Sequence, residues 1–79
     1  MSTVEIDGRV FTQIVGSDLD RDGMYIELAE GGVVVAEIFY SDVTHMMSLT
    51  TFTADVPLEE IEHLIAEAKV RLQSDAARL

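Results

Sequence analysis

Apolar and polar residues alternate along several stretches of the first 54 residues, and this alternation predicts strands. In residues 24–30 (MYIELAE) the apolar Met24, Ile26 and Leu28 occupy alternate positions, the period of a strand with one buried face. Residues 33–42 (VVVAEIFYSD) form the strongest strand candidate because β-branched and aromatic residues dominate them. The stretch VEIDGRVF predicts a hairpin with Asp7-Gly8 in a type I′ turn, and MMSLTTFTA predicts a last strand.

The pattern changes to a helical period after Pro57. Pro57 suits the first position of a helix, and Glu59 and Glu60 follow it where negative charge is favourable. We expect a helix from about Pro57 to Gln73, with the residues after Gln73 fraying. The residues that step by three and four along one apolar stripe are Ile61, Leu64, Ile65, Ala68 and Leu72.

These elements predict one α+β domain over residues 1–79. Its strands occupy about residues 3–54 and form an antiparallel meander of four to five strands. One C-terminal helix, at about residues 57–73, packs on one face of the sheet. A chain of 79 residues leaves no room for a second core.

A single helix covers one face of a sheet, so the other face is expected to stay open. Towards the helix we expect Val34, Ala36, Ile38 and Tyr40, together with Met24, Ile26 and Leu28. On the open face we expect Val33, Val35, Phe39, Tyr25 and Ala29, with Glu27 and Glu37 among them. Such an apolar patch bordered by acids is typical of a protein interface. The alternatives are a curved sheet that buries both faces as small barrels do, and a homodimer seam.

Charge narrows the range of partners. The chain has fifteen Asp and Glu against five Lys and Arg, a net charge of −10. Residues 1–56 carry ten of the acids and only two of the bases. A surface of this sign repels phosphate backbones and attracts a basic protein, although acidity also serves solubility alone. We therefore expect no nucleic-acid partner.

Cysteine content and the lengths of apolar runs bear on location. The chain has no cysteine, and the first ten residues lack the basic and apolar regions of a signal peptide. The longest apolar run, VVVA, is far below the ~20 residues of a membrane span. We expect a cytoplasmic protein with no membrane partner.

The stretch DLDRDG, residues 18–23, resembles the start of a calcium loop. Asp18, Asp20 and Asp22 alternate before Gly23, but a helix–loop–helix calcium site needs Glu at the twelfth position, where this chain has Ala29. We therefore expect no metal and no cofactor here, although weak calcium binding between strands is the alternative. The preferred interpretation is an acidic bend that contacts Lys or Arg of a partner.

Residues for catalysis are sparse. His45 and His63 have no metal-ligand spacing, and nothing presents a nucleophile to His45, so His45 is expected on a loop surface and His63 in solvent on the helix. Glu27 and Glu37 can approach each other on neighbouring strands, but acid–base work requires a cleft that desolvates them. We expect a protein that is not an enzyme.

Residues 31–72, GGVVVAEIFYSDVTHMMSLTTFTADVPLEEIEHLIAEAKVRL, resemble the small acidic immunity proteins of bacterial contact-dependent growth inhibition and related polymorphic toxin systems. The resemblance lies in size, acidity and the order of a meander followed by a helix. It implies a cytoplasmic antidote that binds a cognate toxin domain, often a nuclease, and blocks its activity.

Under this hypothesis the charge and face arguments assign the partner-binding residues. Carboxylates would meet a basic cleft, and an apolar and aromatic centre would anchor the partner. The expected carboxylates are Asp18, Asp20, Asp22, Glu27, Glu37 and Asp42, and the expected anchors are Tyr25, Val35 and Phe39. Two alternatives remain: a regulatory or assembly module that homodimerises through its open face, and a single-strand nucleic-acid binder like the whirly and transcriptional-coactivator group. The latter needs cationic grooves, whereas residues 1–56 contain only Arg9 and Arg21 as bases.

Overall fold

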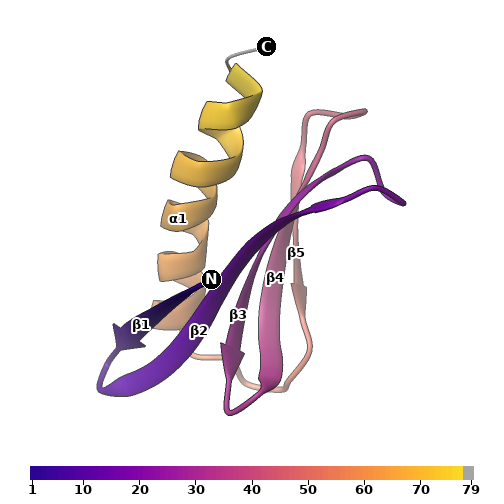
Figure 1. Cartoon of the computed structure of the whole chain (residues 1–79). Helices are drawn as coiled ribbons and strands as arrows, with labels where there is room; N and C mark the ends of the chain where they lie inside the picture. Colours follow the sequence, from indigo (N-terminus) through magenta and orange to yellow (C-terminus); the bar gives the residue numbers. More distant parts are fainter. Residues whose placement is uncertain (78–79) are drawn as a thin grey trace.

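The chain folds into a five-stranded sheet followed by one helix (Figure 1). The structure is a computed structural model that describes the backbone of residues 1–77 and the side chains of residues 1–72. Its elements are β1 (Ser2–Ile6), β2 (Arg9–Asp18), β3 (Gly23–Glu30), β4 (Val33–Ser41), β5 (Met47–Thr51) and α1 (Leu58–Ala77).

The sheet is an antiparallel meander with the strand order β1-β2-β3-β4-β5. This confirms the predicted α+β architecture. Within the described residues β1 pairs only with β2, and β5 pairs only with β4. The sheet therefore has two free edges and does not close into a barrel.

Two of the connecting turns owe their shape to residues with positive φ. Asp7 and Gly8 have φ angles of 50° and 79°, as a type I′ turn between β1 and β2 requires. Gly31 and Gly32 have φ angles of 59° and 82° and turn β3 into β4 in the same way. The predicted Asp7-Gly8 hairpin is confirmed.

Helix α1 begins one residue later and ends later than the sequence predicts. The carbonyl of Pro57 accepts a hydrogen bond from the amide of Ile61 at 3.4 Å, so Pro57 stands at the helix cap. The predicted end at Gln73 is wrong because α1 continues to Ala77 through residues that include neither Gly nor Pro. Fraying at residues 78–79 lies outside the described residues. Nowhere in residues 1–77 is a helix long and apolar enough to cross a membrane.

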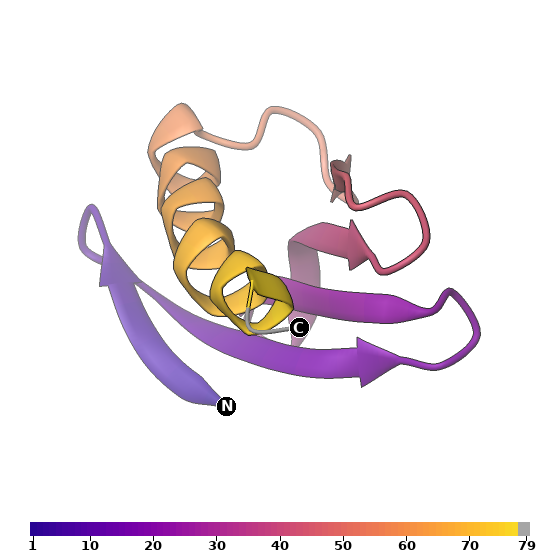
Figure 2. The ribbon, with the colours of Figure 1, turned by 90° about the horizontal axis from the view of Figure 1, so that it is seen from above.

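The core lies between α1 and one face of the sheet. Seen from above in Figure 2, the helix lies over one face of the curved sheet, and β5 forms one edge of that sheet. Helix α1 contributes Leu64, Ala68 and Leu72, all at most 1% exposed. They pack with buried side chains of β2, β3 and β4: Phe11, Ile26, Leu28, Val35, Ala36, Ile38 and Tyr40. The expected helix-facing residues of β3, namely Met24, Ile26 and Leu28, do contact this core.

A β-bulge in β4 reverses part of the predicted face assignment. Leu28 pairs with Ala36 but Ala29 pairs with Val34, so Val35 is an extra residue opposite β3. Val35 consequently joins the core and is only 7% exposed, although alternation placed it on the open face. The same shift puts Val34 on the face of Ala29 and moves Val33 to the helix side. The predicted faces of Val33, Val34 and Val35 are therefore wrong.

A polar network ties the helix to β2. Gln13 is 2% exposed, and its amide donates to Glu67 at 2.9 Å while its carbonyl accepts from Nε2 of His63 at 2.8 Å. Because both ends of the amide have partners, its burial carries no penalty for an unmet hydrogen bond. The expectation that His63 is a solvated helix residue is wrong, since it is half-buried and bonded to the sheet.

Candidate partner-binding surface

The face of the sheet away from α1, which we call the open face, presents two rows of paired side chains. In one row Tyr25 of β3 lies opposite Phe39 of β4. In the next row Glu27 lies opposite Glu37. Directly opposite residues on neighbouring strands are about 4.5–5.5 Å apart at Cβ, so the two carboxylates share one small area. The aromatic and acidic rows predicted from the sequence thus lie side by side.

Arg21 closes over this face from the β2–β3 turn. Its Nη1 and Nη2 donate to the two carboxylate oxygens of Glu37 at 3.2 and 3.3 Å, and its Nε donates to Asp18. Its guanidinium carbon lies 4.1 Å from the centre of the Phe39 ring. A planar guanidinium suits both a fork onto a carboxylate and stacking on an aromatic ring. We call this group of Asp18, Arg21, Glu37 and Phe39 the arginine clasp.

Arg21 affects the carboxyl groups of Asp18 and Glu27 to different extents. The hydrogen bond from Arg21 holds the pKa of Asp18 below its usual value, against the opposing effect of burial. Burial raises the pKa of Glu27, and the neighbouring Glu37 raises it further, while Arg21 partly opposes both effects. No ion pair reaches Glu27 from any residue whose side chain the structure describes. Glu27 is therefore a half-buried carboxylate beside Glu37, and Arg21 forms its ion pair with Glu37.

Three further acids lie together at the end of the sheet where the β2–β3 and β4–β5 turns meet. The amide of Asp42 donates to the carbonyl of Asp22 at 2.8 Å, which holds the two turns side by side. The side chains of Asp20, Asp22 and Asp42 are exposed there. The structure thus joins these acids into one region that continues onto the open face through Asp18.

The DLDRDG stretch is organised by hydrogen bonds within the turn. One oxygen of Asp18 accepts from the amides of Asp20 and Arg21 at 3.1 and 3.2 Å, and the other accepts from the Arg21 side chain. Asp22 takes the left-handed conformation with φ of 49°. In the part of the chain whose side chains are described, no group of three or more His, Cys, Asp or Glu is arranged to hold a metal ion.

The structure changes the predicted set of binding residues in three ways. Glu37 is only 8% exposed and its carboxylate is held by Arg21, so it adds charge to this face without offering a free contact to a partner. Val35 is buried in the core and is not available to a partner, because the bulge turns it towards α1. Arg21 is absent from the predicted set, although it is the centre of the clasp. Its position three residues after Asp18 is the sequence signal for that pairing. Tyr25 and Phe39 are half-buried and remain on the open face.

No protein-family model matches this chain, and no curated protein or solved structure shows significant similarity to it.

Proposed function

We propose that this chain is a toxin-neutralising protein of the immunity type, which captures a basic toxin domain through its acidic surface and blocks the activity of that domain. We define the acidic surface as the six carboxylates of the clasp, the open face and the adjoining turns: Asp18, Asp20, Asp22, Glu27, Glu37 and Asp42. With Arg21 included, this region has a net charge of −5, half of the net −10 of the whole chain. A charge concentrated in this way steers a cationic partner and speeds the encounter.

The observation that carries the proposal is the pair of opposed glutamates. Glu27 and Glu37 face each other across β3 and β4, yet only Glu37 is paired with Arg21. Because Glu27 is half-buried beside another acid, an arriving ammonium or guanidinium would stabilise its charged form and offset the repulsion from Glu37. The clasp itself illustrates how a guanidinium is held on this face, between a carboxylate fork and an aromatic ring.

The same arrangement is less suited to nucleic acid. Single-strand binders stack bases on aromatic rings inside a cationic groove. Here the half-buried rings of Tyr25 and Phe39 adjoin Glu27, Glu37 and Asp18. A phosphate backbone approaching these rings would meet net negative charge, so a basic protein is the better-supported partner.

A co-expression experiment with the product of the neighbouring gene tests this proposal. If that product contains a growth-inhibiting domain, the wild-type chain should restore growth and co-purify with the domain. The double charge reversal Asp20→Lys/Asp42→Lys should weaken binding in calorimetry by at least about tenfold, because close interfacial charge pairs contribute about 1.5 kcal/mol or more. Asp20 and Asp42 are exposed turn residues, so the fold tolerates the change.

The matched control is Glu5→Lys/Glu62→Lys. Both glutamates are exposed and lie outside the acidic surface, and the change in net charge is identical. The control should bind nearly as tightly as the wild type. Equal loss in the two double variants would reduce the effect to overall charge, and unchanged binding in the first would rule out capture by the acidic surface.

A further inference from the structure

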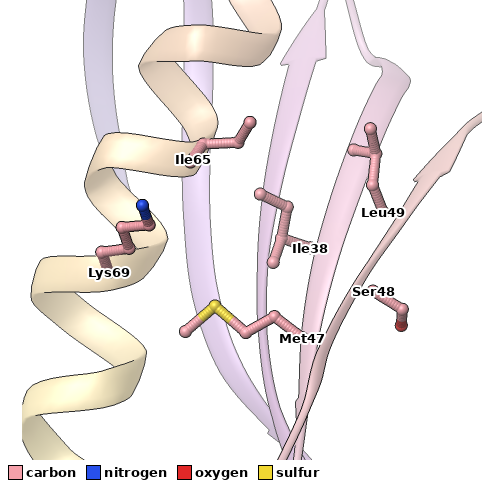
Figure 3. Close-up of a pocket in the computed structure, with 6 residues that line it drawn as sticks. All are labelled: Ile38, Met47, Ser48, Leu49, Ile65 and Lys69. Carbon is pink, nitrogen blue, oxygen red and sulfur yellow. The ribbon is translucent and has the colours of Figure 1, made fainter.

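The second distinctive surface is the free edge of β5 and the groove beside it. The backbone of helix α1 comes close to β1, β3 and β4 but not to β5. Figure 3 shows the resulting gap, with Ile65 and Lys69 of the helix on one side and Ile38, Met47 and Leu49 of the strands on the other. The groove has a volume of about 240 Å³. Ligand pockets are usually about 300–1,000 Å³ with convergent polar groups, so this groove is better suited to the side chains of a protein.

The β5 edge has no charged residue, no proline and no bulge in its pairing with β4. Residues 43–54 are the longest stretch of the chain without Asp, Glu, Lys or Arg, and they contain no proline. Natural edge strands are commonly blocked by charges, prolines or bulges, because an exposed edge pairs with another strand. In a chain of net charge −10, the β5 edge is the strip along which two copies approach with least repulsion.

The hydrogen bonds fix which backbone groups face outward. The amide of Phe52 donates to the carbonyl of Val35, and the carbonyl of Met46 accepts from the amide of Ser41, so both ends of the strand bond inward at even-numbered residues. Backbone groups alternate in direction along a strand. The N–H and C=O groups of Met47, Leu49 and Thr51 therefore point to the free edge.

We propose that two copies of the chain pair antiparallel through β5, about a twofold axis at Leu49, to form a continuous ten-stranded sheet. This register uses all three outward-facing residues, because Leu49 meets its own copy and Met47 meets Thr51 of the other. Antiparallel pairing about a twofold axis is self-complementary, as a closed dimer requires. Both helices then lie on the same face of the sheet, and the two grooves meet above the seam.

The same register explains two exposed apolar residues. Met46 is 69% exposed and Phe52 is 56% exposed in the single chain. Centring the pairing on Leu49 places Met46 of one copy opposite Phe52 of the other, at both ends of the seam. Sulfur and aromatic rings make favourable contacts, and cross-strand pairs of this kind stabilise sheets.

The area needed shows that the edge and the groove must act together. A stable interface buries about 800 Å² on each partner, roughly a sixth of the 5070 Å² surface of this chain. A five-residue strand edge is too small to supply this alone. The half-exposed Leu49 (47%) and Ile65 (39%) add apolar area where the grooves meet.

Sedimentation equilibrium of the full chain, from low micromolar to millimolar concentration, tests the proposal. The molar mass should rise to twice the chain mass of 8.7 kDa and no further. Leu49→Lys should hold the mass at that of one chain because it places two charges at the axis. The matched control Leu19→Lys, at a residue 87% exposed in the β2–β3 turn, should dimerise like the wild type.

A second variant guards against a folding defect. Thr51→Pro removes an outward N–H, so the bonds to β4 are kept and circular dichroism should be unchanged. Thr51→Pro should also be monomeric.

A cysteine variant tests the register, because the chain has no cysteine of its own. Leu49→Cys should oxidise to a cross-linked dimer, since hydrogen-bonded partners lie about 5.5 Å apart at Cα. Leu19→Cys should not cross-link.

The proposal is overturned by a wild-type chain that stays monomeric throughout, by assemblies larger than two, by dimers that survive both Leu49→Lys and Thr51→Pro, or by a dimer in which Leu49→Cys does not cross-link. It is also separable from toxin capture. Asp20→Lys/Asp42→Lys should leave the dimer mass unchanged, and Leu49→Lys should leave binding to a basic partner intact.

Discussion

The ring of Tyr25 lies directly across the backbone of Gly16 on the neighbouring strand. A Cβ added to Gly16 would be 2.7 Å from the phenol oxygen and 2.8 Å from the carbon that carries it. Phe39 covers Gly23 in the same way, with ring atoms 2.5 and 2.7 Å from the corresponding position. Glycine inside a strand weakens it, and an aromatic side chain laid over the gap restores packing. The two rings of the open face therefore lie against the sheet.

We expect Gly16→Ala to displace the Tyr25 ring and to lower the free energy of unfolding by about 1 kcal/mol, the lower end of overpacking costs. In a Tyr25→Ala background the same change should cost nothing or should stabilise, since alanine orders a strand better than glycine. A double-mutant cycle measured by urea unfolding checks this coupling. Equal costs in both backgrounds would show that Tyr25 does not occupy this position.

Gly23→Ala provides the contrast. A Cβ there would lie 2.1 Å from the carbonyl oxygen of Tyr40, which is backbone and cannot swing away. We therefore expect a loss of about 3 kcal/mol or more, at the upper end of overpacking costs. Phe39→Ala should rescue little of this loss. Full rescue by Phe39→Ala in the same urea measurements would contradict the close approach of β3 and β4.

The arginine clasp predicts a linked change in two carboxyl groups when Arg21 is replaced by Met. The pKa of Asp18 should rise towards its ordinary value, because the hydrogen bond from Arg21 is what lowers it. The pKa of Glu27 should rise further, because Arg21 opposes the effects of burial and of Glu37. Carboxyl carbon chemical shifts followed by NMR during a pH titration measure both. Two unchanged values would show that the clasp is absent in solution.

The sign of the stability effect follows from the lowered pKa of Asp18. A carboxyl whose pKa is lower in the folded chain contributes stability above its unfolded pKa, near 3.8, and loses it as the pH falls through the folded pKa. Wild type and Arg21→Met should therefore differ in the free energy of unfolding at neutral pH. The part of this difference that comes from Asp18 should disappear in acid. Thermal unfolding at several pH values should show the convergence.

Glu27 behaves in the opposite direction. Because its pKa is raised in the folded chain, the folded state holds a proton that the unfolded state releases, so stability falls as the pH rises above about 4.5 towards the folded pKa. Glu27→Gln should remove this decline and raise the free energy of unfolding at neutral pH. The exposed Glu62→Gln is the control and should have little effect. A Glu27→Gln chain less stable than wild type at neutral pH would contradict the unpaired state of Glu27.

The order and type of the elements were predictable because period-two alternation, turn residues with positive φ and one apolar helical stripe all point to a meander followed by a helix. The faces of β3 were predictable for the same reason. The faces of residues 33–35 were not predictable, because three successive valines fit equally well with either face buried. The bulge that decides which valine is buried depends on how β4 pairs with Leu28 and Ala29.

The candidate site shows a similar division. Alternation placed Glu27 and Glu37 on one face with Tyr25 and Phe39, and the register bears this out. The role of Arg21 depends on a turn conformation that brings its side chain back over Phe39, which no periodic pattern encodes. The contact between the two turns rests on one backbone hydrogen bond, from Asp42 to Asp22, and backbone bonds between loops leave no mark in the residue types.

The bulge in β4 leads to a prediction that simple alternation would reverse. Val35→Ala removes two buried methyl groups from the core and should lower the free energy of unfolding by about 1.5–3 kcal/mol, at about 0.8 kcal/mol per buried carbon plus a cavity cost. Val34→Ala is the matched control, since Val34 is half-buried on the open face and its loss should cost about 1 kcal/mol or less. Chemical denaturation of the two variants decides between the registers. A larger loss at Val34 than at Val35 would mean that β4 pairs with β3 without the extra residue, and that Val35 belongs to the surface offered to a partner.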